Sequence, residues 1–168
     1  MKSKRGQEVF GMSFGMMFVI FLIIVTVAVS FYVIGHFLNI NKCAQVGSFY
    51  DTLNDEIDSA WRASITRKTF EGSLPSEGFF TSGIEKVCFG DPTQSNIDEA
   101  EEVEIFKRND NQNIFLYPPE KACDGELATT ALKNVEIGDF FCVDVIDGFA
   151  RVRLEKGSRD LKVRIGNV

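Results

Sequence analysis

The stretch MMFVIFLIIVTVAVSFYVIGHF, residues 16–37, decides the fold of this chain. It contains no Asp, Glu, Lys or Arg, and the sequence around it carries none between Glu8 and Lys42. About 20 consecutive apolar residues are enough for a helix to cross the hydrocarbon core of a bilayer. Because lipid offers the backbone no hydrogen-bond partners, such a segment has to be helical despite its many Val, Ile and Phe residues. The sequence therefore predicts a transmembrane helix over residues 12–40, with the lipid bilayer as its partner.

The length of this run favours a retained anchor over a cleaved secretory signal. A secretory signal usually has an apolar region of roughly 7–15 residues, followed by a cleavage site with small residues. Here the apolar run is longer, and the residues after it, His36 to Ile40, lack a small-x-small pattern. We therefore expect residues 12–40 to remain in the mature protein as a single membrane span.

The charges on the two sides of the span predict its orientation. The leader, residues 1–11, has three basic side chains and one acidic side chain, a net charge of +2. The other 15 basic and 23 acidic residues lie in residues 42–168 and give a net charge of −8. Cationic flanks stay on the cytoplasmic side of a membrane. We expect a cytoplasmic leader and an acidic extracytoplasmic domain over residues 41–168. Because nucleic acid is also negatively charged, we do not expect it to be a partner of this domain.

The cysteines fit an exported domain. All four lie beyond the apolar run, and an even number of cysteines in a small extracytoplasmic domain predicts disulfides. A metal site is disfavoured because the sequence contains no CxxC spacing and its one histidine, His36, lies in the apolar run. Three pairings are open, and we favour the one that links the amphipathic helix to the first half of the sheet, Cys43 with Cys88 and Cys123 with Cys142.

An amphipathic helix follows the apolar run and continues to about residue 65. Its apolar residues recur at spacings of three and four, which places them on one face: Val46, Phe49, Tyr50, Leu53, Ile57, Ala60 and Trp61. The two helical segments form either one rod over residues 12–66 or two helices with a bend near Gly47. We expect Phe49 and Trp61 to contact the sheet described next.

Short strands are predicted after residue 66. Residues 69–72 and 84–89 form two of them, and residues 103–107 and 113–117 form a hairpin. A short helix is expected near residues 127–133. At the C-terminus, alternating apolar residues and the turn Asp147-Gly148 predict a three-stranded meander over residues 141–165. An amphipathic helix packed on a mostly antiparallel sheet gives an α+β fold for the domain.

No catalytic set or cofactor site emerges from the sequence. Nucleophilic triads need a histidine base, and His36 lies in or beside the membrane segment. The acidic residues between Asp98 and Glu104 have the pattern of a solvated loop. The spacing Gly11-x-x-x-Gly15 is of the kind that lets two membrane helices approach closely. We therefore expect no enzymatic activity and no cofactor, with self-association or binding of other surface proteins through the membrane helix as an open possibility.

The N-terminal region resembles the class III signal peptides of archaeal type IV pilin-like proteins. The matching residues are the short basic leader Lys4-Arg5-Gly6-Gln7 and the apolar helix that follows it. In that family a membrane peptidase cuts after the glycine, so the resemblance implies a processing site between Gly6 and Gln7. It also implies that the apolar helix packs into a filament core and continues into a half that is covered by a β-sheet.

The whole chain also resembles a group of small archaeal single-pass membrane proteins with four cysteines. The shared segments are Leu74-Pro75-Ser76 and Val87-Cys88-Phe89. That resemblance implies no activity. The sequence thus favours a membrane-anchored cell-surface protein with a structural or interaction role, and the alternative is a processed pilin-like subunit of a surface filament.

Overall fold

The computed structural model describes residues 8–76, 83–94, 106 and 111–168, with side chains described from Gly15 onward. The chain divides into two compact units, residues 1–39 and 40–168. One long helix, α1 (Glu8–Arg62), contributes residues to both units. The break that was considered near Gly47 is absent, because Gly47 lies within α1.

In the second unit, α1 buries one face. The buried residues are those whose spacing predicted an apolar stripe: Val46, Phe49, Tyr50, Leu53, Ile57 and Ala60. The helix ends at Arg62, and the Lys156 ammonium donates hydrogen bonds to the carbonyl oxygens of Trp61 and Ala63. A cation at this position satisfies carbonyls that the helix leaves without partners and complements the helix dipole.

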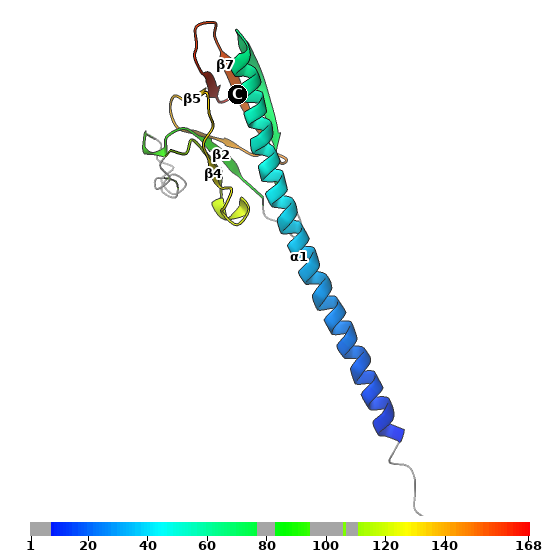
Figure 1. The fold of residues 1–168 in the computed structure, drawn as a ribbon. Coiled ribbons are helices and arrows are strands. Elements are labelled where there is room, and N and C mark those ends of the chain that lie inside the picture. Colours follow the sequence, from blue (N-terminus) through cyan, green and yellow to red (C-terminus); the bar gives the residue numbers. More distant parts are fainter. Residues whose placement is uncertain (1–7, 77–82, 95–105, 107–110) are drawn as a thin grey trace, which may run out of the picture. The chain divides into compact units, whose positions relative to one another are not determined.

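Two four-stranded sheets complete the second unit (Figure 1). The first sheet has the order β1-β7-β8-β5, with bounds Thr66–Ser73, Phe149–Lys156, Val163–Gly166 and Val135–Glu136. The second sheet has the order β4-β3-β2-β6, with bounds Thr129–Thr130, Ile114–Tyr117, Lys86–Phe89 and Phe141–Asp144. All pairs are antiparallel except β5 with β8. Two short 3₁₀ turns, η1 (Pro92–Gln94) and η2 (Pro119–Lys121), lie in the connections.

The helix packs antiparallel to β1, as Figure 1 shows for α1 and the green strand that follows it. The ring of Phe49 lies 5.9 Å from the ring of Phe70, and Glu56, further along the helix, is paired with Lys68, nearer the start of the strand. Gly72 makes this approach possible, because a Cβ at this position would lie 2.5 Å from the Phe49 ring. The apolar face of α1 therefore rests directly on the first sheet.

The second sheet is covered on both faces. Val87, Phe89, Ile114 and Leu116 belong to the main core, with the buried residues of α1 and the first sheet. On the opposite face, Cys88 and Phe115 form a smaller cluster, which is completed by Phe106 and Phe140. This double burial explains why β2 and β3 are short, almost continuous apolar runs instead of alternating strands.

The α+β class is confirmed, but several strand pairings differ from those predicted. β7 and β8 form the expected antiparallel pair, whereas β6 belongs to the second sheet because β1 occupies the other edge of β7. β3 lies between β2 and β4, whereas the predicted hairpin would have paired it with residues 103–107. Those residues lie outside the described part of the chain apart from Phe106, which is helical and buried.

Two local predictions are also wrong. The helix expected near residues 127–133 is replaced by the short strand β4. Trp61 does not pack in the core: it is 40% exposed, and its indole N–H donates to the carbonyl oxygen of Leu161 at 3.0 Å. Trp61 directly follows the buried Ala60 and lies at the rim of the apolar stripe, where its ring stays partly exposed. Phe49 is buried against the sheet, as expected.

Candidate functional site

The first unit presents apolar side chains to its surroundings on every side. All residues from Gly15 to Phe37 are exposed, although nearly all of them are aliphatic or aromatic. Among the described residues, α1 is the one helix long and apolar enough to cross a membrane. A helix that is apolar all round is stable only when protein or lipid surrounds it. In water, each exposed large side chain would forgo about 1.5–3 kcal/mol of burial free energy.

The polar groups inside the apolar segment are already satisfied. The Thr26 hydroxyl lies 2.9 Å from the carbonyl oxygens of Leu22 and Ile23, and the Ser30 hydroxyl donates to the carbonyl oxygen of Thr26 at 2.7 Å. These bonds stay within the helix, so the two hydroxyls need no water. The rings of Tyr32 and His36 stack near the end of the segment, with their centroids 6.4 Å apart.

The glycines singled out in the sequence are only partly described. Gly6 and Gln7, the residues of the possible processing site, lie outside the described part of the chain. Gly11 and Gly15 are both in α1. A Cβ on Gly15 would meet no atom within 4 Å, so this helix surface is open to another helix or to lipid.

All four cysteines form disulfides, as predicted, but the favoured pairing is wrong. The bonds join Cys43 to Cys123 and Cys88 to Cys142. Cys88 and Cys142 are direct neighbours across the antiparallel strands β2 and β6. Sequence spacing gives no sign of this, because β6 was expected to lie in the other sheet.

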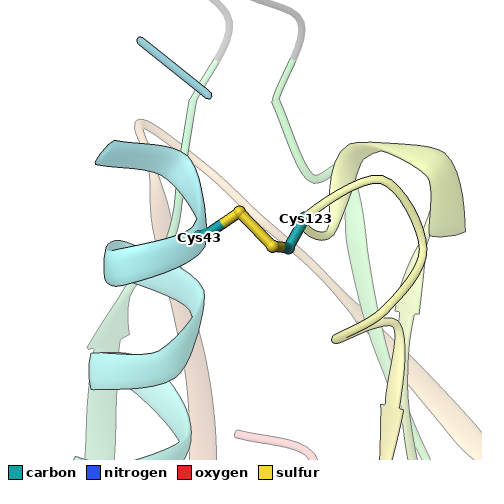
Figure 2. Close-up of a disulfide and its surroundings, with 2 residues drawn as sticks. All are labelled: Cys43 and Cys123. Carbon is teal, nitrogen blue, oxygen red and sulfur yellow. A yellow bond between two sulfur atoms is a disulfide. The ribbon is translucent and has the colours of Figure 1, made fainter. Parts of the chain in front are cut away.

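The Cys43–Cys123 bond attaches α1 to the loop that follows η2. Figure 2 shows Cys43 on the helix facing Cys123 on this loop. Two turns further along α1, the Tyr50 hydroxyl donates to the carbonyl oxygen of Leu127 at 2.8 Å. Burial raises the pKa of this phenol. The disulfide and the hydrogen bond together fix the loop at the start of the second unit.

A row of alternating charges crosses the exposed face of the first sheet. Glu136, Arg164, Glu155 and Arg67 are successive cross-strand neighbours on β5, β8, β7 and β1. The guanidinium of Arg67 lies 2.9 Å from the Glu155 carboxylate, and that of Arg164 lies 3.8 Å from the Glu136 carboxylate. Alternation in the sequence predicted strands over residues 141–165. It missed the row, because the row depends on the register of residues far apart in the chain.

The described residues offer little for catalysis. They contain no group of three or more His, Cys, Asp or Glu side chains that could hold a metal ion. A surface hollow of about 550 Å³ is lined by Ser76, Glu85 and Asp147 among others, and its described lining includes no histidine. The acidic run between Asp98 and Glu104 lies outside the described part of the chain.

Comparison with known proteins did not assign this chain to a family. No protein-family model matches this sequence, and no curated protein or solved structure matches it either.

Proposed function

We propose that this chain is a non-enzymatic, single-pass membrane protein whose disulfide-bonded domain acts at the cell surface by contact with other molecules. The observation that carries the proposal is the all-round apolar exposure of residues 15–37. A lipid bilayer shields this apolar surface from water without requiring a second protein. The internally bonded hydroxyls of Thr26 and Ser30 fit the same surrounding.

The placement of the second unit outside the cytoplasm has two supports. The disulfides Cys43–Cys123 and Cys88–Cys142 are of a kind that persists in oxidising compartments and is rare in the cytosol. The net charge of +2 on the leader favours retention of the N-terminus in the cytoplasm. These two arguments are independent, and they give the same orientation.

A pair of cysteine reporters tests anchoring and orientation together. Ser158 is exposed in the second unit, and Ser3 lies in the leader. A membrane-impermeant maleimide is expected to label Ser158→Cys in intact cells and Ser3→Cys only after the cells are opened. The reverse pattern would overturn the orientation. Release of the protein from membranes by alkaline carbonate would overturn the anchor itself.

A second candidate function is a processed pilin-like subunit. It is favoured by the continuity of α1, which begins at Glu8, directly after Gly6-Gln7, and extends into the part that packs on the first sheet. The mass of the protein purified from its native membrane tests this candidate. A mature chain that begins at Gln7 would support it, whereas a chain that retains residues 1–6 would exclude it.

A further inference from the structure

Within the described part of the chain, the β1 edge of the first sheet is open. β1 pairs with β7 on one side, and no described residue hydrogen-bonds to its other side. The Leu74 N–H donates to the carbonyl oxygen of Gly148, which fixes the phase of the β1–β7 ladder. Because ladder bonds alternate along an antiparallel strand, the backbone groups of residues 67, 69, 71 and 73 point away from β7. An eight-residue strand therefore presents a regular row of free donors and acceptors.

We propose that this edge binds the β1 edge of a second copy of the chain, antiparallel and with Thr69 opposite Thr69 of that copy. In this register Arg67 of each copy faces Glu71 of the other. Both side chains lie on the exposed face, and they are 79% and 47% exposed. Opposite charges and Thr–Thr pairs are the cross-strand neighbours that stabilise antiparallel sheets.

The charges select this register over its neighbours. Registers that keep the outward-pointing backbone groups paired differ from one another by two residues. A shift of two residues in either direction places Arg67 opposite Thr69 or Ser73, so both charge pairs are lost. A further step places Arg67 opposite Arg67, or Glu71 opposite Glu71, and like charges repel. On the opposite face of the strand, the proposed register sets Lys68 against Phe70 and opposes no like charges. The edge is therefore complementary to itself in one alignment.

The pairing would also extend the charge row across both copies. Within one copy, Arg67 pairs with Glu155 at 2.9 Å, and Glu71 pairs with Arg151 at 2.6 Å. Placing Arg67 beside Glu71 of the other copy joins these pairs into one row with alternating signs: Glu155, Arg67, Glu71, Arg151. Arg67 and Glu71 then each have an opposite charge on both sides, so forming the interface breaks no existing ion pair.

The direction of α1 decides how the two copies face each other. The second-unit part of α1 runs antiparallel to β1, as the contacts Phe49–Phe70 and Glu56–Lys68 require. An antiparallel pairing of the strands therefore reverses this part of α1, so the Ile40 ends point in opposite directions. The edge pairing itself depends only on the folded second unit.

Cross-linking at the proposed symmetry axis tests the pairing. All four native cysteines are in disulfides, so Thr69→Cys adds the one free thiol to the full-length protein in detergent. A short bis-maleimide should give at least about tenfold more dimer with Thr69→Cys than with Ser73→Cys, because only residue 69 faces itself. Ser73 is the matched control, since it is exposed on the same strand and points in the same direction. Equal cross-linking of the two variants, or none, would overturn the proposal.

A charge exchange provides a second test that does not depend on the cysteine variants. Arg67→Glu and Glu71→Arg should each weaken dimers of the variant about tenfold, because like charges then meet at two places. An equal mixture of the two variants should restore dimers, since every opposed pair again has opposite signs. A mixture that stays monomeric would overturn the pairing.

Lipid vesicles separate this inference from the proposed anchor. The Thr69→Cys protein is reconstituted into lipid vesicles, and its insertion and its cross-linked dimers are measured separately. Charge-dependent dimers in detergent without insertion into vesicles would support the edge pairing and overturn the anchor. Firm vesicle insertion without dimers in either setting would support the anchor and overturn the pairing.

Discussion

Removal of the Cys43–Cys123 disulfide should destabilise the second unit substantially. The bond closes a loop with a sequence separation of 80 residues. The chain-entropy relation assigns about 4.5 kcal/mol to a loop of that length, and measured losses of native disulfides run at about 2–5 kcal/mol. Both half-exposed cysteines can be replaced by serine without burying an unpaired hydroxyl. We therefore expect the double serine variant to lose about 2–4.5 kcal/mol of unfolding free energy.

Chemical denaturation of the full-length protein in detergent measures this loss. Trp61 is the one tryptophan of the chain and lies at the end of α1 in the second unit, so its fluorescence reports unfolding of that unit. The matched control is Cys88→Ala with Cys142→Ala, which opens a loop with a separation of 54 residues. Chain entropy assigns about 4.2 kcal/mol to that loop.

The comparison of the two variants separates entropy from packing. Cys88 is fully buried against Phe106, Phe115 and Phe140, so its truncation also removes core contacts. The alanine variant should therefore lose more stability than the serine variant, even though its loop is shorter. A loss below about 1 kcal/mol for the serine variant would refute the loop-closure reasoning.

Three further substitutions probe the packing of α1. Gly72→Ala should cost about 1–3 kcal/mol, because its Cβ would lie 2.5 Å from the Phe49 ring and 2.7 Å from the Phe70 ring; partial recovery when Phe49→Leu is added would identify the first clash as a cause. Gly47→Ala should instead stabilise the protein by about 0.5–1 kcal/mol, since this helical site is open and alanine favours the helix. Tyr50→Phe should cost about 1 kcal/mol through the lost hydrogen bond to Leu127, and a neutral effect would show that water replaces it. Denaturation midpoints measure all three.

Local periodicity accounts for the parts of the fold that the sequence predicted well. The spacing of Val46, Leu53 and Ile57 defines one face of a helix wherever that helix packs, so the buried face could be identified in advance. Likewise, Asp147-Gly148 adopts positive φ values of 54° and 79°, which suit the tight turn before β7. Both signals lie within a few residues of the structure that they specify.

The pairings that were missed all depend on distant residues. Alternation in residues 141–145 indicates which side chains point inward, but it does not say which strand lies alongside. The strand β1 takes the edge of β7 because it follows α1 after a short turn and packs beneath it, which leaves β6 to pair with β2. The disulfide pairing follows from that exchange, since it brings Cys142 opposite Cys88.

The same distinction applies to the candidate sites. The long apolar helix could be predicted from residues 16–37 alone, because their composition is the signal. The charge row could not, because Glu136, Arg164, Glu155 and Arg67 come together only through three separate strand pairings. In the sequence, each of them is an ordinary solvent-facing residue of a half-buried strand.

Charges on an edge strand usually keep sheets from joining, and β1 carries some of these features. Lys68 points inward near the edge, which is a common protective device. Here, however, Lys68 is paired with Glu56 of α1, so its charge is compensated within the copy. The outward charges, Arg67 and Glu71, differ in sign and lie two pairing positions apart, so they repel only in misaligned registers. A purely protective edge would repel in every alignment, and the β1 edge instead leaves one alignment attractive.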